Sequence, residues 1–317
     1  MRFKEKIVNL SQIDFRNDAF RITTEKQVDD LMHSITHVGI LHLPLLLKNH
    51  STYTIICGFR RLEACRRLNW SKLEAMVLDP DTIKLKCVKY AITDNAFQRP
   101  LNLIEKSRAI EMMSDFFKDI NRLSEELSVL GLSEHPTMIK KLKGICHLPE
   151  PLQNSILSNT ISLAMVLELS GMSEDDTKGF VKLFNTLKLS LNKQREILTL
   201  VKEIAMREDK PVLQVIDESH LKKILMDEDL DKNQKIHNIR IYLKQRRFPT
   251  IANTEKSYKK YHQKLNLERG IKLIPPTNFE SPTYTLQLSF NNTTQLKGLK
   301  TAFDALVKNP YLKHIVD

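Results

Sequence analysis

The residues best suited to hold a phosphate group stand where a short apolar run, residues 55–57, ends in Gly58 and continues into a basic segment. A strand that turns into a helix leaves the first backbone N–H groups of that helix unpaired, beside the positive end of the helix dipole. Gly58 lacks a Cβ, so a ligand can approach the backbone there. Arg60 and Arg61 then offer planar, permanently charged groups that match phosphate oxygens. The spacing therefore predicts a phosphate site at this junction.

These patterns also have plain structural interpretations. Arg60 and Arg61, together with Arg66 and Arg67, could form a solvated helix face, although the strand and the glycine favour phosphate binding for the first two. Downstream, an Asp94-Asn95 pair is, by itself, typical of a helix N-cap.

Short apolar runs surround the junction. Leu43–Leu47, Tyr53–Cys57 and Leu73–Leu78 are predicted strands, and helical segments separate them. We expect a small α/β unit whose ligand cleft lies where strands are followed by helices.

From Asn102 to about Ala205 the pattern is helical almost throughout. Leu123–Ser133 predicts a short helix with a turn at Gly131, and Pro136–Leu142 predicts a second helix that begins with proline. This is the order of a helix-turn-helix, whose second helix can enter the major groove of DNA. The candidate DNA-binding residues here are Thr137, Lys140, Lys141 and Lys143, although such lysines are usually plain surface charge.

A basic segment follows between Lys235 and Lys264, with Glu255 as its single acidic residue. An exposed helix or linker and a DNA-backbone contact explain it equally well. The candidate contacts are Arg246, Arg247, Lys259 and Lys260. After it, Tyr284–Phe290 alternates like a strand and Thr294–Val307 reads as a helix with one apolar face, which we expect to pair with a second copy of the chain.

Composition sets the class of protein. The 317 residues are 41% hydrophobic and 27% charged, as in ordinary globular domains, and they carry a net charge of +11. This charge favours an anionic partner, with nucleic acid the leading candidate. The four cysteines show no metal-binding spacing and are expected to be reduced thiols. Since there is no apolar leader or membrane-spanning run, we expect a cytoplasmic protein with no membrane partner.

Three segments together resemble the ParB family of DNA-partition proteins. Gly58-Phe59-Arg60-Arg61 resembles its Gly-Glu-Arg-Arg box, Leu31–Leu47 resembles its segment of helix, Gly-Ile turn and strand, and Asp94–Glu105 is similar to its acidic-Asn run. Three boxes in the same order are far more specific than one. The resemblance covers the first half to two thirds of the chain.

The resemblance implies a nucleotide site with CTP and Mg²⁺ as cofactors. Carried over position by position, it assigns phosphate contacts to Gly58, Arg60 and Arg61, and cation ligands to Asp94 and Asn95. It also assigns Asn95, with Thr23 and Thr24, to nucleotide binding. Oxygen ligands of this kind suit Mg²⁺, which keeps several waters and shares the phosphates.

The sequence departs from the family at three places. Phe59 stands where the family has an acidic residue, Asp94 is shorter than the usual Glu, and Gln98 occupies the position of an arginine that here comes one place later, as Arg99. An aromatic ring cannot orient water, so we expect at most a slow CTPase. Nuclease activity is not expected, since no carboxylate cluster for two metals stands near Arg60.

The sequence thus predicts an α+β multidomain protein: a small α/β ParB/sulfiredoxin-like domain, an all-helical helix-turn-helix domain and a small α+β C-terminal element. The predicted ranges are 1–98 for the nucleotide-binding domain, 99–210 for the helical domain, 211–270 for a basic helical connector and 271–317 for a dimerisation element.

Its predicted function is nucleotide-dependent partition of a chromosome, plasmid or mobile element. We expect a nucleoid-associated homodimer that binds DNA, with a ParA-like ATPase as a candidate partner. The alternatives are a transcriptional regulator on the same scaffold and, further off, a nuclease or a sulfiredoxin-like ATP-dependent enzyme. In the last of these Cys57 would supply the thiol, although a buried strand cysteine is the favoured interpretation.

Overall fold

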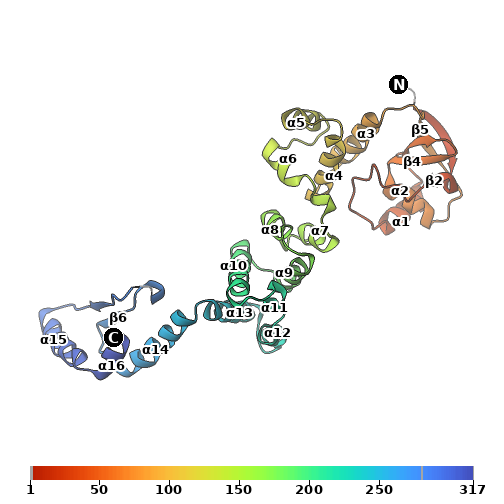
Figure 1. Ribbon diagram of the computed structural model, residues 1–317. Coiled ribbons are helices and arrows are strands. Elements are labelled where there is room, and N and C mark those ends of the chain that lie inside the picture. Colours follow the sequence, from red (N-terminus) through yellow and green to blue (C-terminus); the bar gives the residue numbers. More distant parts are fainter. Residues whose placement is uncertain (1–2, 280, 317) are drawn as a thin grey trace. The chain divides into compact units, whose positions relative to one another are not determined.

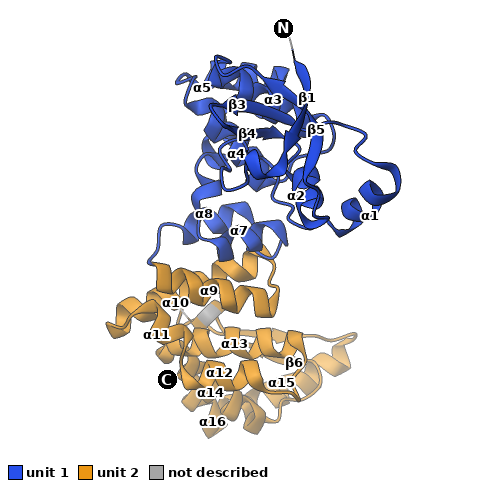
Figure 2. Ribbon diagram, turned by 90° about the vertical axis from the view of Figure 1, so that its right-hand side faces the viewer, with its two compact units in different colours: residues 1–173 blue, residues 174–317 orange. Residues whose placement is uncertain are grey.

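The computed structural model describes residues 3–279 and 281–316, and the contacts within the chain define two compact units, residues 1–173 and 174–317 (Figures 1 and 2). The fold class is α+β, as predicted, with a sheet near the N-terminus and a mainly helical remainder. The division into four domains stays a prediction.

A five-stranded sheet forms the centre of the N-terminal domain. Its strands are β1 (Lys4–Asn9), β2 (Ile13–Asp14), β3 (Leu45–Asn49), β4 (Thr52–Cys57) and β5 (Lys72–Leu78). They lie in the order β1-β5-β3-β4-β2, with β3 antiparallel to β4 and parallel to β5. The three predicted strands are present. Strands β1 and β2 were not predicted, since β1 buries only Val8 and lacks an apolar alternation.

Eight α-helices follow or flank this sheet among the described residues of the first unit. They are α1 (Asp29–Val38), α2 (Phe59–Arg67), α3 (Lys84–Ala96), α4 (Leu103–Ser114), α5 (Ile120–Val129), α6 (Pro136–Leu142), α7 (Glu150–Leu157) and α8 (Leu163–Leu169). Helix α2 buries Leu62, Ala64 and Cys65 in the core that also contains Leu46 and Ile55 of the sheet. This packing fixes the strand-to-helix junction at Gly58.

Helices α5 and α6 are joined by a turn at Gly131. Asp119 caps α5. Pro136 occupies the first turn of α6, and this second helix has the bounds predicted from the sequence. Gly131 has a φ of 87°, and a Cβ there would lie 3.1 Å from the Phe97 ring. Glycine is thus required both by backbone conformation and by close packing.

The second unit is helical up to residue 265 and then forms a small α/β module. Its helices are α9 (Glu174–Leu187), α10 (Leu191–Glu208), α11 (Val212–Ile216), α12 (Ser219–Met226), α13 (Lys232–Arg247), α14 (Pro249–Leu265), α15 (Thr293–Val307) and α16 (Pro310–Val316). Strands β6 (Ile271–Ile274) and β7 (Thr285–Leu288) form an antiparallel pair. The predicted strand and helix of this module are present as β7 and α15. Within the described ranges, no helix has the length and apolar character needed to cross a membrane.

Candidate functional site

A cavity of about 870 Å³ opens in the first unit where β4 is followed by α2. It is lined from several segments: the residues before α1, the loop before β3, the start of α2 and the last turn of α3 with the residues after it. Its lining includes the predicted residues Thr23, Gly58, Arg60, Arg61, Asp94 and Asn95, and also Gln98 and Arg99. Thr24 instead lines a neighbouring cavity of about 430 Å³.

Gly58 holds the left-handed conformation that begins α2. Its φ is 89°, and a Cβ at this position would lie 2.9 Å from the Cβ of Pro44. The sequence argument needed glycine for the approach of a ligand. The structure adds a second reason, since the loop before β3 packs directly against the Gly58 backbone.

Both arginines of the junction are anchored by backbone carbonyls. Arg60 donates from Nη2 to the Gln27 carbonyl at 2.9 Å, and Arg61 donates from Nη1 to the His42 carbonyl. The Nη2 atom of Arg61 also lies 3.7 Å from Oδ2 of Asp94, across the cavity from α2 to α3. The two guanidinium groups are therefore positioned before any ligand binds, which reduces the entropy cost of binding.

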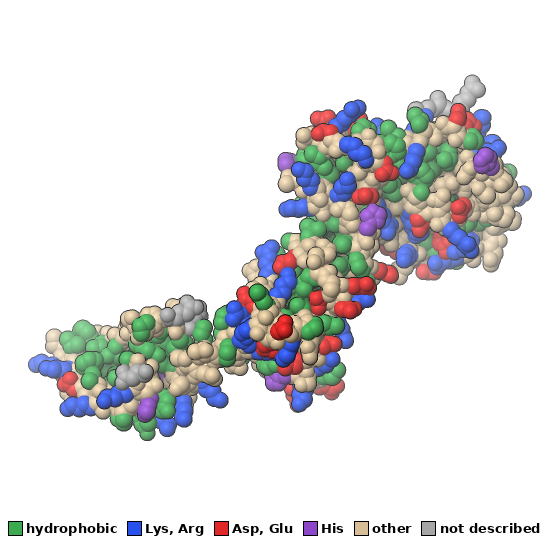
Figure 3. Space-filling model, in the orientation of Figure 1, with side chains coloured by type: hydrophobic (Ala, Val, Ile, Leu, Met, Phe, Trp, Pro, Cys, Tyr) green, Lys and Arg blue, Asp and Glu red, His purple; other side chains and the backbone are tan. Residues whose placement is uncertain are grey.

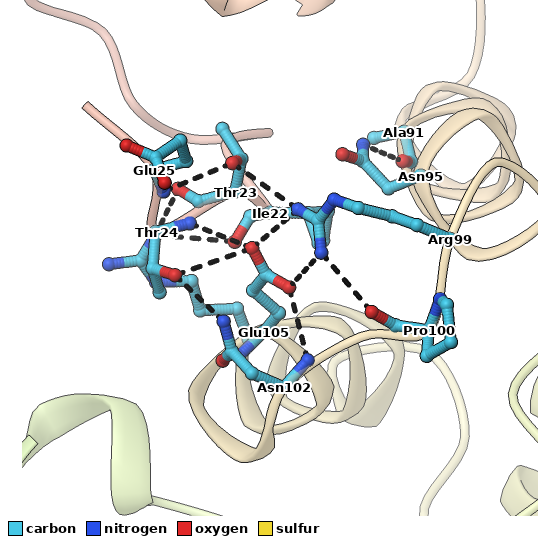
Figure 4. Close-up of polar contacts among 11 residues, drawn as sticks. Ile22, Thr23, Thr24, Glu25, Ala91, Asn95, Arg99, Pro100, Asn102 and Glu105 are labelled. Atoms are coloured by element: carbon cyan, nitrogen blue, oxygen red, sulfur yellow. Dashed lines mark hydrogen bonds and ion pairs between the residues drawn. The ribbon is translucent and has the colours of Figure 1, made fainter. Parts of the chain in front are cut away.

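Asp94 and Asn95 lie in the last turn of α3, so their interpretation as a helix N-cap is wrong. Asn95 donates from Nδ2 to the Ala91 carbonyl at 2.8 Å, which leaves its Oδ1 as an acceptor (Figure 4). Asp94 accepts a 3.2 Å hydrogen bond from Gln98. The cavity thus holds a carboxylate and an amide oxygen beside the two arginines.

A buried carboxylate, that of Glu105, links the segments beside the cavity through hydrogen bonds (Figure 4). Glu105 is 1% exposed and binds Arg99 through two contacts of 2.7 Å. It also accepts the backbone N–H of Thr24 at 2.9 Å and that of Asn102 at 3.1 Å. Burial raises the pKa of Glu105, but the hydrogen bonds from Arg99 and the two backbone groups outweigh it, and the net pKa is lowered.

The same cluster holds the segment with the two threonines. Arg108 donates to the Thr23 carbonyl at 2.8 Å, and Asn102 donates from Nδ2 to Oγ1 of Thr24 at 2.8 Å. Sequence reasoning missed Glu105, Asn102 and Arg108. The signal that could have found the first two is the capping box at the start of α4, where Asn102 and Glu105 cap each other.

Cys57 lies at the end of β4 and is buried. Burial, followed by the charge of Asp94, raises the pKa of its thiol well above the usual range. Because the thiolate is the reactive form, this thiol is a poor nucleophile. The structure therefore weighs against a sulfiredoxin-like enzyme. Among the described residues, no group of three or more His, Cys, Asp or Glu side chains is placed to hold a metal ion.

The predicted DNA-contacting residues divide into exposed and paired side chains. Thr137, Lys140, Lys141 and Lys143 are all exposed on α6 or just after it. Arg246 is 13% exposed and forms ion pairs with Glu208 and Glu218.

The division is less sharp for the other basic candidates, because Lys259 is paired and yet 71% exposed. Arg247 pairs with Glu203 at 2.6 Å, Lys259 pairs with Glu255 within α14, and Lys260 is exposed beside the Tyr261 ring. Sequence reasoning missed the partners of the arginines because they come from other helices. On the face that Figure 3 shows, basic and acidic side chains are interspersed over the N-terminal and middle parts, whereas basic side chains predominate over the C-terminal part.

The first unit is thus an α/β domain with an arginine-lined cavity at a strand-Gly-helix junction, as expected for a domain that binds a phosphate-bearing ligand. Residues 4–96 match the family model of the ParB N-terminal domain. Curated relatives agree. The chain is 26% identical over 223 residues to a probable chromosome-partitioning protein ParB of Campylobacter jejuni, covering 69% of this chain and 76% of the relative. It is 25% identical over 215 residues to a nucleoid occlusion protein of Bacillus licheniformis, covering 66% and 73%.

Among solved structures, C-terminally truncated ParB from Caulobacter crescentus complexed with CTP-γ-S is 18% identical, with a TM-score of 0.27 over 57% of this chain and 98% of that one. Residues 4–96 therefore match the ParB N-terminal domain, and the chain is similar to ParB-like partition and nucleoid occlusion proteins, as the sequence motifs indicated.

Proposed function

We propose that the first cavity binds a nucleoside triphosphate, with CTP as the expected nucleotide. The observation that carries this proposal is the convergence of Gly58, Arg60 and Arg61 with Asp94 and Asn95 on one cavity of about 870 Å³. Two anchored guanidinium groups supply charge for a triphosphate, and the apolar lining residues Leu31, Leu41, Leu43 and Met76 supply a surface for the base and sugar. The choice of CTP rests on the resemblance of residues 58–61 to the ParB box.

A Mg²⁺ ion fits the donor set beside the arginines. The Asp94 carboxylate and the Oδ1 of Asn95 are hard oxygen ligands, and two protein ligands suffice for an ion that also binds phosphates and water. The ion would neutralise phosphate charge. Arg61 lies 3.7 Å from Asp94, so it would orient this carboxylate as well as contact the nucleotide.

We further propose a DNA-binding role in partition. The partition and nucleoid occlusion proteins among the relatives support it, as does the net charge of +11. In this proposal the exposed residues of α6 read base edges and exposed lysines contact phosphates. The C-terminal module pairs two copies, since α15 leaves Leu296 and Phe303 exposed. A transcriptional regulator on the same scaffold remains the second candidate, and a ParA-like ATPase remains a candidate partner.

Calorimetry with ATP, CTP, GTP and UTP in the presence of Mg²⁺ tests the nucleotide proposal. We expect CTP to bind and Arg61→Ala to weaken it by at least about tenfold, since a hydrogen bond to a charged group contributes about 1.5–3 kcal/mol. Lys48→Ala removes an exposed charge from the same domain outside the cavity and is the matched control. Absence of binding heat with all four nucleotides would reject the proposal.

A further inference from the structure

A further cavity, of about 300 Å³, lies beside the N-terminal half of α2 and is distinct from the one that Thr24 lines; it is called the second cavity below. Phe59 and Arg60 line both cavities, whereas the remaining lining residues of the second one do not touch the first. They are Phe15, Arg16, Arg21, Glu25, Lys26, Val28, Ile55, Glu63, Arg66 and Arg67. Apart from Arg60, no lining residue of this second cavity has a part in the nucleotide proposal.

The rim of this cavity is strongly basic. Six cationic side chains line it, against two acidic ones, Glu25 and Glu63. Glu63 is already bound to both Arg66, at 2.8 Å, and Arg67, at 3.0 Å, and the hydrogen bond from Arg66 is the largest factor that lowers its pKa.

The remaining cations have fewer partners. Arg21 lies 3.3 Å from Asp18, an exposed residue outside the lining. Arg16 and Lys26 form no ion pair with any residue in the ranges 3–279 and 281–316. The rim therefore keeps an excess of positive charge that internal carboxylates do not cancel.

The floor of the same cavity is apolar and aromatic. Phe15, Val28, Ile55 and Phe59 form it, and the two phenyl rings are packed against the core of the domain. The Arg66 guanidinium lies 5.2 Å from the centre of the Phe15 ring, and that of Arg21 lies 5.7 Å from the Phe59 ring. These cation–π contacts hold charged groups next to the apolar surface.

We propose that this second cavity binds a small phosphate ester that carries a planar base, a ligand of nucleoside monophosphate size. The phosphate would bind Arg16 and Lys26 at the rim, and the base would cover the apolar floor. A volume near the lower end for ligand pockets favours a small molecule over a duplex, which needs an extended surface. Arg60, which borders both cavities, places this ligand next to the triphosphate site without making the two sites one.

The test uses the full chain with Arg61→Ala, because Arg61 lines only the first cavity. This variant is titrated with AMP, CMP and inorganic phosphate at low salt without Mg²⁺. We expect saturable binding of a monophosphate and weaker binding of inorganic phosphate, which cannot cover the aromatic floor. Adding Arg16→Ala and Lys26→Ala should weaken monophosphate binding about tenfold or more, and both residues are exposed, so the fold should persist.

The matched control replaces Lys48 and Lys72 by alanine, which removes the same charge from exposed positions outside this cavity. Monophosphate affinity that is unchanged by the Arg16 and Lys26 substitutions, or no better than that of inorganic phosphate, overturns the proposal. The proposal is also overturned if the Arg16 and Lys26 substitutions weaken only the binding of duplex DNA. Titration of CTP with Mg²⁺ into protein that carries only the Arg16 and Lys26 substitutions tests the two sites separately. If the first cavity does not bind CTP, this titration shows it, whereas the monophosphate titrations report only on the second cavity.

Discussion

Phe59 is the first residue of α2 and lies between the two cavities, with Arg21 stacked on its ring. We expect nucleotide turnover by the native protein to be slow or absent, because no acidic group stands at this position to orient water. Phe59→Glu should raise phosphate release, and a carboxylate at a helix N-terminus is also compatible with the helix dipole. Phosphate release with CTP and Mg²⁺ measures this, with Phe59→Gln as the uncharged control. Brisk release by the native protein would contradict the expectation.

Gly58 makes a separate prediction, about stability. Gly58→Ala places a Cβ 2.9 Å from the Cβ of Pro44 in a backbone conformation with a φ of 89°. We expect a loss of at least about 1–2 kcal/mol from the left-handed conformation alone, and more from the contact. Denaturant unfolding of the native protein and of Gly58→Ala measures it. The control is Gly144→Ala, which is also in the left-handed conformation, with a φ of 82°, but meets no atom within 4 Å of its added Cβ. Equal losses in the two variants would show that packing against Pro44 adds nothing.

At the scale of elements, Glu105 joins α4 to the segment that lines the first cavity. Its pKa is lower in the folded protein than in the unfolded chain, so it contributes stability above pH 4.5 that is lost as the pH falls through the folded value. Glu105→Gln should cost about 1.5–3 kcal/mol at pH 7, because Arg99 loses a charged partner. The cost should shrink toward pH 3.

Urea unfolding across this pH range measures the difference between the two proteins. Glu125→Gln, which changes an exposed carboxylate on α5, is the matched control. A cost for Glu105→Gln that does not change with pH would show that the charge of Glu105 has no part in holding α4.

Helix α6 carries the prediction about sequence reading. Thr137 and Lys140 are exposed on it, so Thr137→Ala with Lys140→Ala should reduce the preference for a specific duplex over a scrambled one and leave much of the non-specific binding. Fluorescence anisotropy on both duplexes at one salt concentration provides the comparison. Full retention of the sequence preference would remove α6 from the DNA-reading role.

Helices and strands were predicted correctly from the sequence where a local pattern of residues determined the structure. Strands β3, β4 and β5 each contain a short apolar run, and α6 begins with Pro136. Strand β1 escaped prediction because it is formed by pairing with β5 and not by its own pattern.

The same distinction applies to the candidate site. Resemblance to a family brought residues 58–61 and Asp94 together, whereas the bond between Thr24 and Glu105 joins residues 81 positions apart and has no local pattern. The pairing of Arg246 with Glu208 and Glu218 likewise forms only when α13 packs against the end of α10 and the residue before α12.

For the whole molecule, this pairing changes what the basic segment is expected to do. Removing one side chain that binds a DNA phosphate should reduce the slope of log affinity against log salt by about 0.9. Lys259→Ala with Lys260→Ala should therefore weaken binding to all DNA and flatten its salt dependence. Arg246→Ala and Arg247→Ala should act mainly on stability, because Arg246 is the principal cause that lowers the pKa of Glu208 to about 2. Removing Arg246 leaves Glu208 and Glu218 without this partner.

Anisotropy at several salt concentrations, paired with thermal unfolding of each variant, separates the two effects. We expect the lysine pair to change the salt slope at an unchanged Tm, and the arginine pair to lower the Tm with little change in slope for the protein that remains folded. The double variant Lys48→Ala with Lys72→Ala is the control, because it removes two charges elsewhere on the chain. A large change in slope from Arg246→Ala at an unchanged Tm would mean that this side chain leaves its two glutamates to bind DNA, and that its ion pairs in the free protein are a resting arrangement that DNA displaces.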